Sequence, residues 1–105
     1  MRAWLPRVLL RIRRQAVARR VRLTQKARFE IAALGFDEED ACDVLAKLTA
    51  HESAGRVLSK ATREWLYLFK PNVTGTLLYL KLVLRRECVV ISFHEDENGH
   101  EQDDP

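Results

Sequence analysis

The sequence lacks an apolar run long enough to cross a membrane. In its 105 residues the purely apolar stretches reach only a few residues, whereas a transmembrane helix needs about 18 or more. Arginines flank the short apolar run Val8, Leu9 and Leu10, and no small-residue cleavage site follows, so we do not expect the N-terminus to be a secretory signal. An Arg-rich, acid-poor start leaves an organellar transit peptide open as an alternative. The length fits one domain with one core, and we expect no contact with a membrane.

Cysteine is scarce as well, with two residues in the chain. Cys42 and Cys88 lie far apart and show neither a CxxC pair nor a Cys/His spacing typical of zinc ligands. We therefore expect neither a disulfide framework nor a metal site, and this cysteine usage favours a reducing compartment, the cytoplasm. Two Trp, two Tyr and four Phe argue against wholesale disorder.

The first part of the chain has almost no acidic residues, and the last part has no basic ones. Residues 1–36 hold ten Lys or Arg and a single acid, Glu30, whereas residues 95–105 hold six acids and no base. The segment 37–94 holds eight of each sign, so the net charge of +3 averages a basic arm, a neutral body and an acidic tail. Such an asymmetry is typical of contact with a polyanion, with nucleic acid the first candidate. A solvated helix surface followed by a disordered tail explains the same pattern.

Helical periodicity dominates the first half of the chain. Apolar residues at helical spacing, with arginines on the other side, predict a basic amphipathic helix near residues 4–16. Thr24 is a candidate N-cap for a second helix, which Gly35 ends. Asp37 and Asp40 have the spacing of a capping box at the start of a third helix. The stripes expected to be buried are Trp4, Leu5, Val8, Leu9, Ile12 and Ala16 in the first helix, and Ala41, Val44, Leu45 and Leu48 in the third.

The periodicity changes from 3.6 to 2 after His51, which predicts strands. These strands are expected at 56–60, 64–70, 76–85 and 88–94. Arg86 and Glu87 make a tight reversal, so the last two strands form an antiparallel hairpin. Residues 19–24 are expected to be a short extended link, and residues 72–75 a turn.

The order of elements, helices first and strands after, predicts an α+β fold. The N-terminal helices are expected to pack on one face of a three- to four-stranded antiparallel sheet and to leave the other face partly open. We divide the chain into a basic amphipathic helical extension at 1–18, an α+β domain at 19–94 and an acidic disordered tail at 95–105.

Strand periodicity groups polar side chains on one sheet face. Tyr79 and Lys81 share a face of the strand 76–85, opposite a row of leucines. Strict alternation in 88–94 puts Ser92 and His94 on the same face as Cys88 and Val90, opposite Val89, Ile91 and Phe93. A hairpin then brings Tyr79, Lys81, Ser92 and His94 together. The alternative is an ordinary sheet face, with Tyr79 half-buried and His94 solvated at a strand end.

This group has the chemistry for cutting RNA without a metal. The reaction needs a base for the 2′-hydroxyl proton, a cation for the crowded phosphate and an acid for the leaving 5′ oxygen. Histidine exchanges protons near neutral pH, and a tyrosine can bind a phosphate or stack on a base. The residues that can supply positive charge are Lys81, Arg56, Lys60 and Arg63.

Four strings of the sequence resemble the MqsR (motility quorum-sensing regulator) family of type II toxins. They are WLYLFKP, TGTLLYLKL, CVVISFHED and the helical segment ARFEIAALGFDEEDACDVLAKLT, and the resemblance spans roughly residues 19–97. It implies a RelE-like fold and an mRNA interferase, an endoribonuclease that cuts transcripts and needs no metal or other cofactor. It also implies two partners, the RNA substrate and a cognate antitoxin protein that holds the toxin inactive.

The resemblance also implies site residues. Tyr79 matches the strand tyrosine thought to act at the family's site, and His94 stands where better-known members carry a catalytic lysine. Leu66 replaces a glutamine, and the second catalytic lysine has no clean match, Arg56 being nearest and Lys60 the runner-up. We thus expect Tyr79, His94, Arg56 and Lys60 as catalytic residues and Lys81, Arg63 and Ser92 as substrate-binding residues. Because the site departs from the family pattern, a non-catalytic module that binds nucleic acid or a protein partner is the alternative.

Overall fold

The computed structural model describes residues 2–96. Its helices are α1 (Leu5–Val17), α2 (Gln25–Ala33) and α3 (Glu38–Ala46), with a 3₁₀ turn η1 (Ala50–Glu52) after α3. Its strands are β1 (Val21–Leu23), β2 (Ser53–Leu58), β3 (Trp65–Phe69), β4 (Asn72–Val73), β5 (Thr76–Leu84) and β6 (Cys88–Glu95). No helix in the described part of the chain combines the length and apolar composition needed to cross a membrane.

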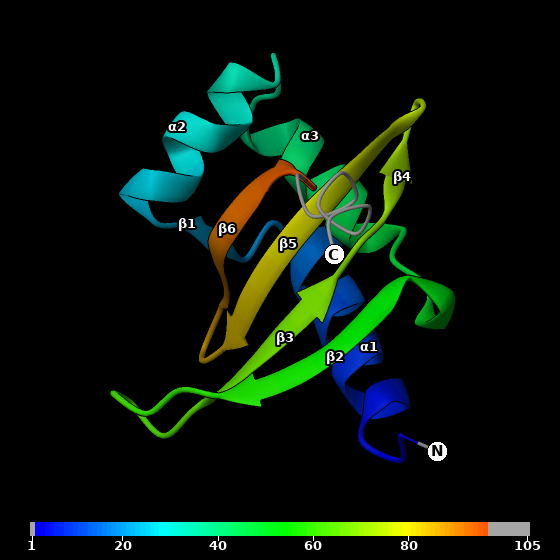
Figure 1. The fold of residues 1–105 in the computed structure, drawn as a ribbon, viewed down its shortest axis with the longest axis vertical. Helices are drawn as coiled ribbons and strands as arrows, with labels where there is room; N and C mark the ends of the chain where they lie inside the picture. The colour runs from blue at the N-terminus through cyan, green and yellow to red at the C-terminus, as the bar shows by residue number, and fades with distance from the viewer. Residues whose placement is uncertain (1, 97–105) are drawn as a thin grey trace, which may run out of the picture.

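The strands form one sheet in the order β1-β6-β5-β3-β2, and the short β4 pairs with β5. Figure 1 shows α1 and α3 behind this sheet and α2 beside β6, so the described helices leave the front face open. The predicted α+β class is confirmed. The sheet is larger than predicted, with six strands, and is mixed because β1 runs parallel to β6.

β1 is one of two described strands that the sequence did not predict. Val21 pairs with Cys88 and Leu23 with Val90, while the segment had been expected to be a link. Three residues are too short to show a clear period of two, and the partner strand lies far away in the sequence. Residues 72–75 likewise include the two-residue β4 before their turn.

The predicted helix signals are confirmed. The Thr24 hydroxyl accepts the N–H of Ala27 at 3.1 Å, and Gly35 follows α2 with a φ of 78°. The capping box is complete, since the N–H of Asp40 donates to Asp37 at 2.8 Å and the N–H of Asp37 donates to Asp40 at 2.9 Å. Local capping chemistry therefore sets the start of α3.

α1 shares one hydrophobic core with the rest of the domain. Its buried residues, Leu5, Leu9, Ile12 and Ala16, belong to the same cluster as the inner residues of α3 and the sheet. The guanidinium of Arg13 donates to the carbonyl oxygen of Leu48, and that of Arg11 donates to the carbonyl oxygen of Arg85. The boundary expected after residue 18 therefore does not separate two cores.

The predicted start of the disordered tail, at residue 95, is wrong for the first two residues of that segment. Glu95 is the last residue of β6, and the buried Asp96 donates its N–H to the carbonyl oxygen of Leu77 at 2.8 Å. Its carboxylate lies 3.3 Å from Lys70 Nζ. Backbone pairing and this ion pair outweigh the polar composition of these two residues. Residues 97–105 lie outside the described part of the chain.

A β-bulge in β6 corrects the predicted faces of that strand. Lys81 pairs with Ser92 but Leu82 pairs with Val90, so one extra residue, Ile91, is inserted between them. The insertion shifts the alternation by one residue. Cys88, Val90 and Phe93 consequently all face the core, although strict alternation placed Phe93 on the opposite face.

Candidate active site

The open sheet face brings Tyr79, Lys81, Ser92 and His94 together. Tyr79 is the direct partner of His94, and Lys81 is the direct partner of Ser92, in the β5–β6 pairing. Partners in register project to the same face. The rings of Tyr79 and His94 stack with their centroids 5.2 Å apart and their planes at 26°. The grouping thus matches the one expected from periodicity.

The environment of the His94 imidazole fixes which nitrogen is free. Its Nδ1 lies 2.8 Å from the carbonyl oxygen of Glu95. Because a carbonyl oxygen can only accept, Nδ1 must carry the hydrogen of this bond. In the neutral ring Nε2 then has the lone pair. The half-buried His94 can therefore accept a proton on Nε2 at the open face.

α2 adds a lysine to the site that sequence reasoning missed. Lys26 Nζ donates to Ser92 Oγ at 3.0 Å and lies 2.8 Å from the carboxylate of Glu30. The N–H of Phe93 also donates to Glu30, at 2.9 Å. The i, i+4 spacing of Lys26 and Glu30 could have predicted their ion pair. The position of Lys26 beside Ser92 depends on the packing of α2 against β6, which no local sequence pattern shows.

Glu30 is held in its ionised form by this network. Partial burial is the largest single influence and favours the neutral acid. The Lys26 hydrogen bond, the Phe93 N–H and the charges of Lys26 and His94 together outweigh that burial. They bring the pKa of Glu30 below its ordinary value of 4.5. Glu30 thus remains a carboxylate that can hold Lys26 in place at neutral pH.

Lys70 is a second cation that sequence reasoning did not single out. Phe69 pairs with Leu80, so Lys70 is level with Tyr79, and alternation turns its side chain away from the core. Lys70 forms the ion pair with Asp96, whose side chain is 2% exposed. The register therefore places this pair on the same side of the sheet as Tyr79. No motif marked it because Asp96 was assigned to the tail.

Arg56 lies on the other face of the sheet. It pairs in register with Tyr67, whose side chain points into the core. Its guanidinium lies over the rings of Trp4 and Trp65, at 4.8 Å and 3.8 Å from their centroids. Leu66, by contrast, pairs with Val83 on the open face. The structure therefore separates Arg56 from the Tyr79–His94 pair.

Lys60 and Arg63 lie at the far end of the sheet. Both are exposed in the loop that joins β2 to β3, beyond the pair formed by Leu58 and Trp65. Leu66, near this end of the sheet, pairs with Val83 of β5, and Tyr79 lies four residues farther along β5. At the usual rise of a strand this separation is roughly 13 Å. These two cations do not join the group around Tyr79.

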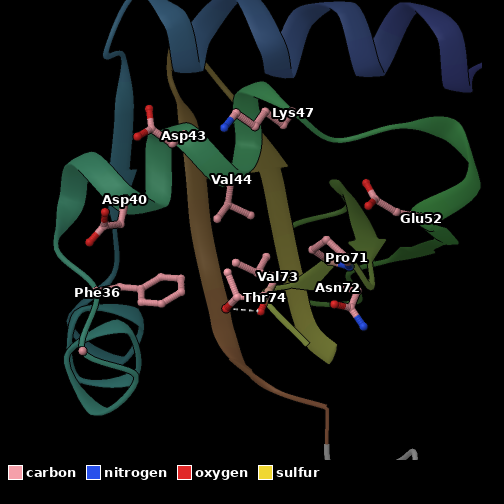
Figure 2. A pocket seen from close by; sticks show the side chains of 11 residues that line it. Phe36, Asp40, Asp43, Val44, Lys47, Glu52, Pro71, Asn72, Val73 and Thr74 are labelled. Atoms are coloured by element: carbon pink, nitrogen blue, oxygen red, sulfur yellow. Dashed lines mark hydrogen bonds between the residues drawn. The ribbon is translucent and has the colours of Figure 1, made fainter. Parts of the chain in front are cut away.

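A cleft of about 500 Å³ lies elsewhere, between α3 and the turn that joins β4 to β5. Figure 2 shows Val44 and Val73 pointing toward each other across it, with Phe36 at one side. No sequence-predicted site residue lines this cleft. Within residues 2–96, no group of three or more His, Cys, Asp or Glu side chains could hold a metal ion. The candidate chemistry therefore lies on the open sheet face.

Comparison with known proteins identifies a family for this chain. No curated protein matches the sequence closely enough to count as a relative. A family described as "Motility quorum-sensing regulator, toxin of MqsA" matches residues 6–95. The matched region starts in α1, earlier than the resemblance noted from the sequence strings, and ends with the last residue of β6. Because the match covers most of the 105 residues, the chain belongs to the MqsR family of toxins of toxin–antitoxin systems.

Proposed function

We propose that this toxin is a metal-independent endoribonuclease, an mRNA interferase that cleaves RNA by attack of a 2′-hydroxyl on the adjacent phosphodiester. The observation that carries the proposal is the stack of His94 on Tyr79 on the open sheet face. Family membership supports it, since the resemblance to MqsR toxins implies this activity. The substrate in this proposal is RNA, and the regulatory partner is a cognate antitoxin.

His94 is the general base in this scheme. Its Nε2 takes the proton from the 2′-hydroxyl, because Nδ1 is occupied by the carbonyl of Glu95. The 2′ oxygen then bonds to phosphorus, and the bond from phosphorus to the 5′ oxygen breaks. The 5′ oxygen gains a proton from water, and His94 then releases to water the proton that it took from the 2′ oxygen, so the proton count balances. The products are a 2′,3′-cyclic phosphate and a 5′-hydroxyl.

Tyr79 and Lys81 bind the phosphate in this scheme. The phenol hydroxyl can donate to a phosphate oxygen, and the Lys81 ammonium offsets the charge that builds on the phosphate. Ser92 lies beside Lys81 and holds Lys26 toward the same face. We assign Arg56 no part in bond breaking because it lies on the opposite face. Lys60 and Arg63 are left to contact RNA farther along the strand.

The experiment incubates the purified protein with single-stranded RNA in excess chelator. We expect discrete fragments that end in cyclic phosphates, and we expect His94→Ala to abolish them. His51→Ala is the matched control, because His51 is exposed in η1 and lies outside the group. Failure to cut any transcript, with or without ribosomes, would overturn the proposal.

The alternative function, a non-catalytic binding module based on the basic N-terminal helix, predicts a different result. RNA binding would then weaken steeply with salt and survive His94→Ala. Two of the arginines on which it relies, Arg11 and Arg13, already donate to carbonyl oxygens of the domain. This engagement favours the open sheet face over α1 as the main RNA contact.

A further inference from the structure

We propose that α2 carries a second RNA subsite, in which Lys26 holds a backbone phosphate and Phe29 stacks on a base. The subsite would bind a nucleotide that flanks the scissile phosphate. It rests on the proposed ribonuclease function and extends it to a helix at the edge of the sheet.

The Lys26 ammonium is held in position before any RNA binds. It donates to Ser92 Oγ at 3.0 Å and pairs with Glu30 at 2.8 Å. An ammonium has three hydrogens, so one remains for a phosphate oxygen. The Lys26 side chain is 59% exposed, whereas that of Glu30 is 20% exposed. The solvent-facing ammonium of Lys26 is thus held by the mostly buried carboxylate of Glu30. Because the ammonium is already held in place, little side-chain freedom is lost when a phosphate binds.

The position of Lys26 links it to the candidate active site. Its partner Ser92 is paired with Lys81 and lies two residues before His94 on the open face. A phosphate on Lys26 therefore lies beside the group around His94 and Tyr79. Two residues along a strand span about 7 Å, a separation that suits a neighbouring phosphate of the same RNA strand.

Phe29 lies one helical turn beyond Lys26 on α2. Its ring is 68% exposed, and residues three apart on a helix are neighbours on its surface. Among the described residues the ring has no aromatic or cationic partner, unlike the exposed Trp65, which Arg56 covers. An unstacked aromatic ring beside a cation is the pairing that single-stranded RNA sites use.

The charge around α2 favours RNA over a protein partner. The segment 19–28 holds five cations and no acid. Arg22 is exposed, and it is level with Val89, so β1 projects it toward the open face. Two of these cations already form ion pairs on the surface, Arg28 with Glu38 and Arg19 with Glu39. A phosphate chain that crosses from His94 toward β1 would meet Lys26 and then Arg22.

Binding of an RNA that cannot be cut tests this subsite. The probe is a short single-stranded RNA with 2′-methoxy groups, and the full chain is used. We expect Phe29→Ala to weaken binding on the order of 5- to 100-fold, the effect of losing one base stack. Phe29→Tyr keeps an aromatic ring at this position and should bind the probe about as well as the wild type does. The control is Val17→Ala, which changes a residue 69% exposed on α1.

Three further variants separate stacking and charge from a structural effect. In Phe29→Trp, RNA should quench fluorescence more than in the wild type, because the new indole stacks on a base. Lys26→Gln should weaken binding and lower the slope of log affinity against log salt by about one phosphate contact, and Lys26→Arg should keep that slope.

The outcomes distinguish this proposal from the proposed function. If the protein cuts RNA but Phe29→Ala binds the probe as well as wild type, the subsite is wrong and the ribonuclease stands. If the protein cuts no RNA yet loses probe affinity in Phe29→Ala and Lys26→Gln, the subsite stands alone. An unchanged salt slope in Lys26→Gln overturns the phosphate contact.

Discussion

The backbone N–H of Phe93 donates to the carboxylate of Glu30 at 2.9 Å, and this bond joins α2 to the bulged part of β6. β1 ends at Leu23, opposite Val90, so within residues 2–96 the outer edge of β6 has no strand partner beyond that point. Glu30 supplies the missing acceptor. The same carboxylate holds Lys26, so one acid supports both the edge of the sheet and the proposed RNA contact.

Glu30→Gln should make the free energy of unfolding less dependent on pH in the acid range. The pKa of Glu30 is lowered in the folded state. Its ionised form therefore stabilises the fold above the unfolded pKa, near 4.5, and this contribution is lost as pH falls through the folded pKa. The glutamine keeps an oxygen for Phe93 but loses the charge. We expect a loss of about 1 kcal/mol at pH 7 that fades as pH falls below 4.5, measured by urea unfolding.

Glu38→Gln is the matched control for this prediction. Glu38 pairs with Arg28 on the surface, where its side chain is 60% exposed, and such pairs contribute little to stability. Parallel stability curves for wild type and Glu30→Gln between pH 7 and pH 3 would contradict the role given to Glu30.

Ile12→Ala should destabilise the whole domain. Ile12 is fully buried in the core cluster that α1 shares with the sheet, and truncating such a side chain to alanine costs about 2–5 kcal/mol. Leu10→Ala, at a position 47% exposed on the same helix, should change the free energy of unfolding by about 0.5 kcal/mol or less. Equal effects of the two variants would show that α1 does not pack as described.

Much of the fold was predictable because its signals are local. The capping box of Asp37 and Asp40 and the cap at Thr24 each depend on residues within a few positions. The long alternation of β5 is similarly local. The bulge at Ile91 was not predictable, because the inserted residue is apolar and fits either face. Its consequence, Phe93 in the core, follows only from the pairing with Leu80.

The candidate site was predictable on the strands and not beyond them. Tyr79 and Lys81 follow from the period of two, and the hairpin brings His94 to the same face. Lys26 reaches the group from α2, and Lys70 through Asp96, by contacts between distant parts of the sequence. The prediction of Arg56 rests on its charge and on its nearness to the position of a family lysine, whereas the pairing with Tyr67 turns it to the helix side.

Neither cysteine should react with alkylating reagents in the native protein. Burial raises the pKa of the Cys88 thiol to about 12, and its neighbour Cys42 adds to this effect. On the order of one Cys88 thiol in ten thousand is then a thiolate at pH 8. Burial also raises the pKa of Cys42, and both residues are free and buried. Iodoacetamide should label both only in denaturant, by mass spectrometry, and full labelling of the native protein would contradict the described packing.

His94→Lys should move the pH dependence of RNA cleavage upward. The family resemblance implies a lysine at this position, and His94 is the proposed base on the open face. A lysine side chain ordinarily loses its proton near pH 10.4, whereas an imidazole does so near 6.5. A general base must be unprotonated to act. The variant should therefore be at least about tenfold slower at pH 7 and gain activity as pH rises to 9. The measurement is the rate at which one RNA is cleaved at a series of pH values, with chelator present. The control is His51→Lys, in η1, which should keep the pH profile of the wild type. If His94→Lys keeps it as well, proton transfer does not pass through residue 94, and the base must be sought among the other groups that line the open face.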